Sequence, residues 1–307
     1  MSGTVPAPLG FVAHYNLLEQ LEPSGPGDLF RARDTRLGRT VTVRMLSPEY
    51  ASDPAERAAL LARVNGMTAL SHPNITAVFS AGEENGRVFL VFEHLFGQPL
   101  RAEMAGRQMN VRRSVELAIQ IADGVADAHA AGFIHGGLSP DSIIITAKGH
   151  SKIPAFELAS RAGFDDVTEG ARLRDYDSPE EAGGQIPDER SDIHSVGAVL
   201  YEMLAARRPS HKGAAAPSVA NRHVPPELDD IVLRAVAPNP DRRCQSAVTL
   251  AAELRSVVAI LDVRGGAGDD EADTENGAPS AHAGHALLIA LIVLLGVATV
   301  VWLVTRG

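Results

Sequence analysis

The sequence is poor in the residues that secreted proteins and nucleic-acid-binding proteins need. Among its 307 residues there is one cysteine, Cys244, so the chain forms no internal disulfide, which fits a reducing compartment. Basic residues are in the minority, because 28 Lys and Arg stand against 38 Asp and Glu, a formal net charge of −10. Such a chain repels a phosphate backbone, which excludes a general nucleic-acid binder and predicts no nucleic-acid partner.

A secretory signal is also missing. The first 20 residues contain neither the charged region nor the uninterrupted apolar run of a signal peptide. Hydrophobic residues make up 45% of the chain, which is enough for a full-sized core in one large domain or two modest ones. Because the signal peptide is missing, we expect the folded part of the chain to stay in the cytoplasm.

One long apolar run is present near the C-terminus. Residues 286–304 contain no charged residue, and a helix over them would extend roughly 28 Å. The acidic, Gly-rich residues 265–285 before it cannot form a core and predict a flexible linker. A buried C-terminal helix is disfavoured, because the run is apolar around its whole circumference. We expect a single-pass helix in the inner or plasma membrane, a short tail at 305–307, and the folded part on the cytoplasmic side.

The first hundred residues have the patterns of short strands and one helix. Residues 41–45 and 87–92 are alternating or β-branched runs, and Asn85-Gly86 before the second run predicts a hairpin turn. Residues 54–70 have helical spacing and stop before a proline. This predicts a β-rich lobe over residues 15–95, after an N-terminal tail at 1–14.

From about residue 98 the pattern is helical. Apolar residues between 115 and 126 line one face of a long helix for which Asn110 is a candidate N-cap. Further helices are predicted through 196–203 and 250–257. The expected fold class is therefore α+β, with the β-rich lobe followed by a helical lobe over residues 96–264.

Seven short segments with distinctive residue combinations follow one another along the chain. They read FRARDTRLGR from Phe30, LSHPNI from Leu70, HGGLSPDSIII from His135, KIPAFELA from Lys152, SPE from Ser178, DIHSVGAVLYEM from Asp192 and NPDRRCQSA from Asn239. Each is weak alone, but together they are specific. In their order and spacing they resemble the motifs of the bacterial Ser/Thr protein kinase family. The resemblance covers the chain from about Tyr15 to Ile260 and implies a bilobal protein-kinase fold.

The resemblance also shows departures at the positions that carry the family's chemistry. Phosphoryl transfer needs a phosphate cradle, a lysine held by a glutamate, a catalytic aspartate and metal ligands. Arg44 stands at the strand Lys, Arg63 at the helix Glu, Gly137 at the catalytic Asp, Ser139 at the loop Lys, Ser142 at the metal-binding Asn and Ala155 at the metal-binding Asp. The resemblance therefore predicts no catalytic residue and no metal site.

The nucleotide positions depart in the same way. Glu22 and Ser24 replace two of the three glycines of the phosphate loop, and Gly27 is the third. Thr42 stands where the family packs a small Ala against adenine, and Phe92 is the bulky residue at the back of that site. These positions predict weak or no ATP and Mg²⁺ binding, hence no cofactor. The alternative is that Asp141 or Glu157 holds Mg²⁺ in place of the lost aspartate.

The positions with an architectural role in the family are kept. The resemblance implies that Glu180 pairs with Arg243 and that Asp192 holds the backbone of the catalytic loop. Met67, Val78, His135 and Phe156 fall at the four positions of the family's hydrophobic spine. We therefore interpret His135 as a packed residue rather than a general base.

Two main hypotheses follow for function. The first is a membrane-anchored pseudokinase, not an enzyme, that acts as a scaffold or regulator in Ser/Thr kinase signalling. The alternative is an atypical active Ser/Thr protein kinase that binds ATP through a degenerate site. A third possibility is an adaptor phosphorylated by a neighbouring kinase at Thr168, which lies among acidic residues. The expected partners are proteins, such as an active Ser/Thr kinase or a phosphothreonine-reading domain.

Overall fold

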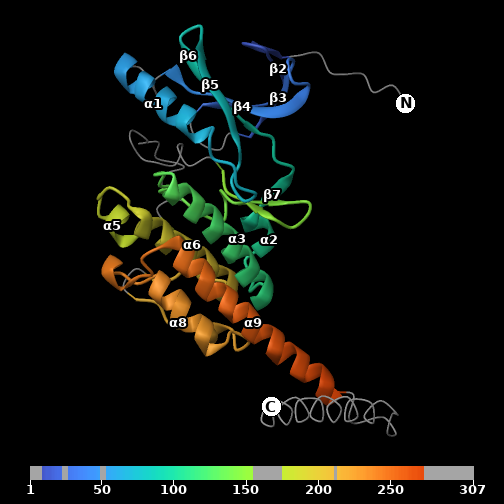
Figure 1. Cartoon of the computed structure of the whole chain (residues 1–307), viewed down its shortest axis with the longest axis vertical. Helices are drawn as coiled ribbons and strands as arrows, with labels where there is room; N and C mark the ends of the chain where they lie inside the picture. Colours follow the sequence, from blue (N-terminus) through green and yellow to red (C-terminus); the bar gives the residue numbers. More distant parts are fainter. Residues whose placement is uncertain (1–8, 23–26, 49–52, 155–174, 211–212, 273–307) are drawn as a thin grey trace, which may run out of the picture. The chain divides into compact units, whose positions relative to one another are not determined.

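The computed structural model describes residues 9–22, 27–48, 53–154, 175–210 and 213–272. The chain divides into two units, residues 1–258 and 259–307. The first unit contains an N-terminal sheet with one long helix and a C-terminal bundle of helices (Figure 1). The α+β, bilobal arrangement expected from the sequence is therefore confirmed.

The N-terminal lobe is an antiparallel sheet of six strands in the order β1-β2-β3-β4-β6-β5. The strands are β1 Gly10–Val12, β2 Tyr15–Leu21, β3 Asp28–Asp34, β4 Arg39–Met45, β5 Val78–Glu84 and β6 Arg87–Glu93. The turn between β5 and β6 is the predicted Asn85-Gly86 pair, with φ angles of 52° and 75°. Both angles lie in the left-handed region that this hairpin turn needs.

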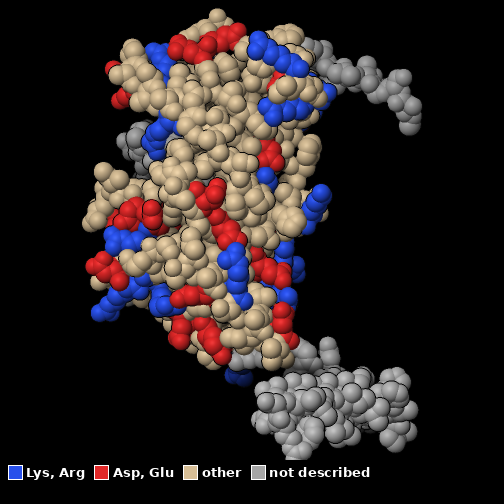
Figure 2. Space-filling view, in the orientation of Figure 1, with Lys and Arg blue, Asp and Glu red and all other residues tan. Residues whose placement is uncertain are grey.

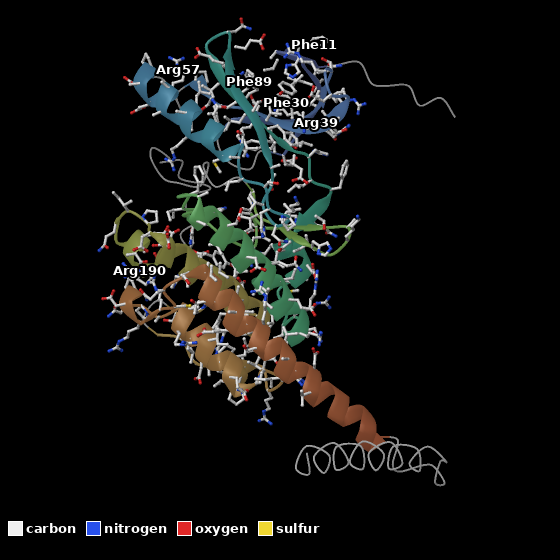
Figure 3. The ribbon with its side chains drawn as sticks, viewed as in Figure 1. Phe11, Phe30, Arg39, Arg57, Phe89 and Arg190 are labelled. Carbon is white, nitrogen blue, oxygen red and sulfur yellow. The ribbon has the colours of Figure 1, made fainter. Side chains whose placement is uncertain are left out.

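One face of this sheet forms the core of the lobe. Val41 and Val43 of β4 are fully buried there. Phe89 of β6 belongs to the same buried cluster, and Phe30 packs against it (Figure 3). Because side chains alternate along a strand, Thr42 and Arg44 lie on the opposite face. Helix α1, Pro54–Met67, is capped by the Asp53 carboxylate and packs against β5.

The C-terminal lobe is built around two long helices, α3 and α6. The amide N–H of Arg113 donates to the Asn110 side chain (3.1 Å), which is the predicted N-cap of α3. The helical elements are α2 Leu100–Met104, α3 Val111–Ala130, α5 Pro179–Ala182, α6 Glu189–Ala205, α7 Pro217–Ala220, α8 Pro226–Ala235, the 3₁₀ turn η3 Pro240–Arg242 and α9 Ala247–Ala272. A small sheet is formed by β7 Gly97–Pro99, β8 Ile144–Thr146 and β9 Ser151–Lys152. Strand β7 precedes α2 in the chain, whereas β8 and β9 follow α3.

Two boundaries differ from those expected. Strand β1 lies within the predicted tail 1–14, because its three residues are stabilised by pairing with β2. Helix α9 continues to Ala272, so residues 265–272 of the predicted linker are helical. Within the described ranges, no helix combines the length and apolar character needed to cross a bilayer. The predicted span at 286–304 and the tail at 305–307 lie outside the described residues.

Candidate active site

The backbone of the loop between α3 and β8 is held by hydrogen bonds to one buried carboxylate. Asp192 of α6 is completely buried and accepts the backbone N–H groups of His135 and Gly136, each at 2.8 Å. The His129 ring of α3 lies 2.7 Å from the same carboxylate. The structure thus brings Asp192 to the loop backbone, as the resemblance implied, at the two residues that directly precede Gly137.

The serines of this loop hydrogen-bond to each other. The Ser139 N–H donates to Ser142 Oγ (3.1 Å), and the Ser142 hydroxyl donates back to the Ser139 carbonyl (3.0 Å). Asp141 stands between them with its side chain 46% exposed. It is the carboxylate nearest in sequence to the family's metal-binding position at Ser142.

Asp141 belongs to an ionic cluster around Arg101 of α2. The Arg101 guanidinium donates to Asp141 (3.1 Å), to Glu202 of α6 (2.7 Å) and to the Tyr176 hydroxyl, and Tyr176 donates to Glu202. Burial and the hydrogen bond to Glu202 raise the pKa of Tyr176. Sequence reasoning missed this cluster, because Arg101 and Glu202 are a hundred residues apart and only the Glu202 motif is distinctive.

Glu180 and Arg243 form a bidentate pair. Two guanidinium nitrogens of Arg243 donate to the two Glu180 oxygens at 2.6 and 2.7 Å, and the side chain of Arg243 is fully buried. The Ser191 hydroxyl donates to Glu180 as well (2.9 Å). Burial is the largest single effect and raises the pKa of Glu180, but the hydrogen bonds from Arg243, the backbone and nearby serines together outweigh it and lower the pKa to about 2. The pair links the start of α5 to the turn after η3.

The described members of the predicted spine are buried. Met67, Val78 and His135 are 1%, 5% and 1% exposed. Burial lowers the pKa of His135 to about 4, against the opposite effect of the Asp192 carboxylate. His135 is therefore neutral at neutral pH, which suits a packed residue. The fourth member, Phe156, lies outside the described residues.

The two cations at the family's Lys and Glu positions have different surroundings. Arg44 is 6% exposed and lies on the sheet face opposite the core, whereas Arg63 is exposed on α1. The α1 side chains that are buried instead are Val64 and Met67. The structure therefore keeps one buried cation, Arg44, at the position from which the family contacts phosphates.

Part of the predicted phosphate loop can be placed. Gly27 has a φ of 81°, and a Cβ there would overlap the Met45 carbonyl, so only glycine fits. Glu22 is exposed at the end of β2. Ser24, Ala155, Glu157 and Thr168 lie outside the described residues, so these predictions are not placed.

Thr42 and Phe92, which the sequence placed at the adenine site, lie beside a histidine that the sequence did not predict there. Thr42 pairs with Phe92 across β4 and β6, and the Thr42 hydroxyl hydrogen-bonds to His94 Nδ1 at 3.0 Å. Glu93 at the end of β6 accepts a hydrogen bond from Lys152 Nζ at 2.8 Å. Sequence reasoning missed His94 and the Lys152–Glu93 pair, because neither partner is near the other in sequence.

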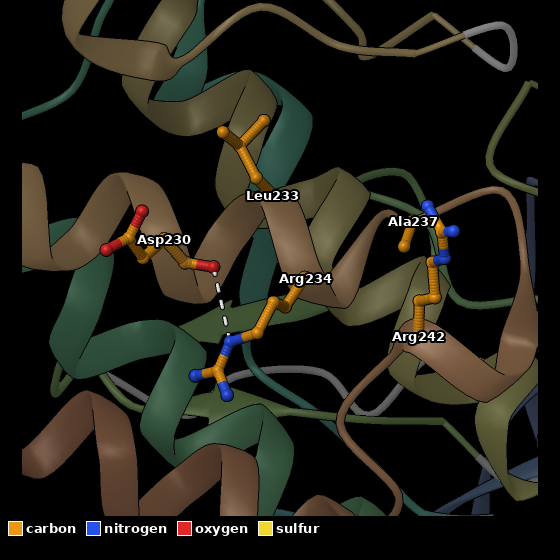
Figure 4. A pocket seen from close by; sticks show the side chains of 5 residues that line it. All are labelled: Asp230, Leu233, Arg234, Ala237 and Arg242. Atoms are coloured by element: carbon orange, nitrogen blue, oxygen red, sulfur yellow. Dashed lines mark hydrogen bonds between the residues drawn. The ribbon is translucent and has the colours of Figure 1, made fainter.

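A surface pocket of about 520 Å³ lies elsewhere, on the C-terminal lobe (Figure 4). The residues that line the pocket belong to α8 and η3 or directly follow α8. At its edge, Arg234 Nε donates a hydrogen bond to the backbone carbonyl of Asp230 (3.4 Å). Its lining residues are Asp230, Leu233, Arg234, Ala237 and Arg242. None belongs to the loop at 135–142, so the pocket is separate from the candidate site.

The two lobes and the loop held by Asp192 have the arrangement that the resemblance in the sequence implied. The family model for the protein kinase domain matches residues 15–253. This chain belongs to the protein kinase family.

The relatives are bacterial Ser/Thr kinases. The chain is 32% identical over 265 residues to the probable serine/threonine-protein kinase SCO3848 of Streptomyces coelicolor, with 79% of this chain and 39% of the relative covered. It is 34% identical to PknB of Mycolicibacterium smegmatis, covering 78% and 42%, and 32% identical to PknA of Mycobacterium tuberculosis, covering 80% and 61%. The chain thus spans about two to three fifths of the length of these relatives.

A solved structure shows the same fold. The crystal structure of the PknI kinase domain of Mycobacterium tuberculosis superposes with a TM-score of 0.67 at 21% identity. The likeness covers 82% of this chain and 99% of that chain. At this identity, the comparison supports the fold alone.

Two predictions from the sequence are wrong. We expected a chain that is not an enzyme and that uses no cofactor, but its relatives are named as Ser/Thr protein kinases and its family model is the kinase domain. These names point to an enzyme and to the use of ATP and Mg²⁺. The prediction counted substituted side chains, whereas phosphoryl transfer depends largely on a scaffold that positions the reactants.

Proposed function

We propose that the chain is an atypical Ser/Thr protein kinase that binds Mg-ATP between its two lobes and phosphorylates protein substrates slowly. The observation that carries this proposal is the anchoring of the loop at 135–137 by Asp192, through two backbone hydrogen bonds of 2.8 Å. The loop backbone is held even though Gly137 offers no side chain. Loss of a general base costs about 10²- to 10⁴-fold in rate, so the positioned reaction is slowed rather than abolished.

The described residues fit part of the nucleotide. Arg44 is a buried cation on the sheet face that carries Thr42, and a guanidinium suits phosphate oxygens. Mg²⁺ would enter on the ATP phosphates and needs only one or two protein carboxylates. Asp141 does not fit this role in the described arrangement, because both of its oxygens lie 3.1–3.4 Å from the Arg101 guanidinium, and we therefore assign no metal ligand. When bound, Mg-ATP would supply the phosphoryl group, and its Mg²⁺ would offset part of the negative charge on the phosphates. The protein's own part is to hold the phosphates with Arg44 and to orient the loop with Asp192.

The test is phosphate transfer by the full chain with labelled ATP and Mg²⁺, followed by mass spectrometry of the phosphorylated residues. We expect slow, Mg²⁺-dependent transfer. Arg44→Ala should weaken ATP binding about 10- to 100-fold, because it removes a charge-assisted contact, while Arg44→Lys keeps most of the affinity. Arg36→Ala, in the exposed β3–β4 turn, is the matched control. Transfer that does not exceed the EDTA background would contradict the proposal.

We also propose that residues 286–304 anchor the kinase in a membrane, on the strength of their uncharged composition. The full chain should sediment with membranes and resist high-salt extraction. The double variant Leu291→Arg/Leu294→Arg should move to the soluble fraction, because each central arginine disfavours insertion by about 2.5–3.5 kcal/mol. A matched Leu291→Ala/Leu294→Ala variant should stay with membranes. An equal distribution of all three forms would reject the anchor.

The proposed kinase function implies protein partners. Membership of the kinase family implies protein substrates. An active Ser/Thr kinase or a phosphothreonine-reading domain is a further proposed partner of this chain. Acidic and basic side chains are interspersed on the face drawn in Figure 2. Such a mixed surface does not favour a nucleic-acid backbone as a ligand.

A further inference from the structure

Thr42 and His94 form a polar pair on the sheet face opposite the lobe's core. Thr42 of β4 is opposite Phe92 of β6, and His94 follows Phe92 by two residues. Residues two apart on a strand share a face, so Thr42 and His94 are diagonal neighbours. The 3.0 Å bond between the Thr42 hydroxyl and His94 Nδ1 matches this arrangement. The pair joins the sheet to the segment that leads out of the N-terminal lobe.

The His94 ring is held from a second side. It meets the Phe96 ring edge to face, with centroids 4.7 Å apart and an interplanar angle of 88°. Burial, with a contribution from Arg31, lowers the pKa of His94, and Glu19 acts in the opposite direction. The ring is therefore neutral at neutral pH and has one donor and one acceptor nitrogen. A neutral ring fixed in this way is a suitable partner for a hydroxyl.

A hydroxyl at position 42 has a physical consequence for nucleotide binding. The resemblance places the flat, apolar face of a purine against this residue, where the family has Ala. A bound purine would remove water from the hydroxyl, and a desolvated hydroxyl without a partner is costly. The His94 nitrogen supplies that partner from within the protein, before any ligand binds.

We propose that Thr42 and His94 act as one hydrogen-bonded unit in the base-contacting wall of the ATP site, with His94 as the positioning residue that keeps the Thr42 hydroxyl satisfied under a purine. The inference rests on the proposed ATP-binding function and names the residues that shape its base site. A hydrogen-bonding side chain is needed at position 94 only when the residue at position 42 carries a hydroxyl.

A double-mutant cycle on the full chain tests this unit, with ATP affinity measured by calorimetry. His94→Phe keeps a ring against Phe96 but removes the nitrogen, so the Kd for ATP should rise about 5- to 100-fold. Thr42→Ala removes the hydroxyl that needs a partner. The double variant Thr42→Ala/His94→Phe should therefore return to the Kd of Thr42→Ala. In turnover assays, His94→Phe should raise the KM for ATP and leave kcat unchanged.

Controls separate this inference from the function on which it rests. Thr40→Ala, two residues earlier on β4, should bind ATP like the wild type, and thermal unfolding should show that every variant is folded. If the wild type binds ATP but His94→Phe is not weakened, or the double variant remains as weak as His94→Phe, the unit does not exist. If the folded wild type binds no ATP, the proposed function and this inference both fail.

Discussion

Gly137→Asp should raise the rate of phosphate transfer by about 10²- to 10⁴-fold, which is the contribution of a general base placed at the reacting hydroxyl. Position 137 follows the two residues whose N–H groups are bound by Asp192, so the backbone that would carry the new carboxylate is already held. The substitution therefore supplies a side chain to a positioned loop. Turnover of the full chain with Mg-ATP and a peptide substrate measures the gain.

Gly137→Asn is the matched control, because it has the same shape as Asp and is not a base. We expect no gain in rate from it. ATP affinity should be similar in both variants, since the added side chain acts on the accepting hydroxyl. Equal rates for Asp and Asn, with ATP bound, would mean that position 137 does not face the reacting group.

Arg243→Ala should destabilise the folded protein by about 3–5 kcal/mol, because it leaves the Glu180 carboxylate without its bidentate partner. For a domain of this size the melting temperature should fall by about 6–20 °C. Thermal unfolding followed by circular dichroism measures the change. Arg255→Ala is the control, because its 2.6 Å bond to Asp123 is as short but the Arg255 side chain is 53% exposed. That variant should lose no more than about 1 kcal/mol.

The same pair makes stability depend on pH in a defined window. The pKa of Glu180 is lowered to about 2 in the folded state from a usual value near 4.5, so its contribution is complete above pH 4.5. It is lost as the pH falls from 4.5 toward 2. Arg243→Ala should flatten this part of the stability curve. A curve of unchanged slope, together with a small loss of stability, would mean that the pair does not hold α5 to the turn after η3.

Much of the fold could be predicted because its signals are local. The turn at Asn85-Gly86 follows from two residues that tolerate a positive φ, and the start of α3 follows from the Asn110 side chain. Strand β1 has no such signal. Its three residues are a strand only because β2 supplies the hydrogen bonds, so the sequence pattern placed them in a tail.

The site was predictable only where family motifs mark it. The motifs located Asp192, Glu180 and Arg243, and the structure brings the last two into a bidentate pair. The motifs also led to the wrong prediction of a chain without activity or cofactor. A substituted side chain can be read from a sequence, whereas the backbone positioning that remains depends on hydrogen bonds between distant segments.

The sequence by itself determined the bilobal class of fold, the family and the identity of each substituted position, because these depend on composition, period and motif order. Only the tertiary structure decided which side chains meet. Thr42 reaches His94 across 52 positions, and Arg101 gathers Asp141, Tyr176 and Glu202 from three other segments. Contacts between side chains so far apart depend on the packing of the whole lobe, and no local pattern in the chain encodes them.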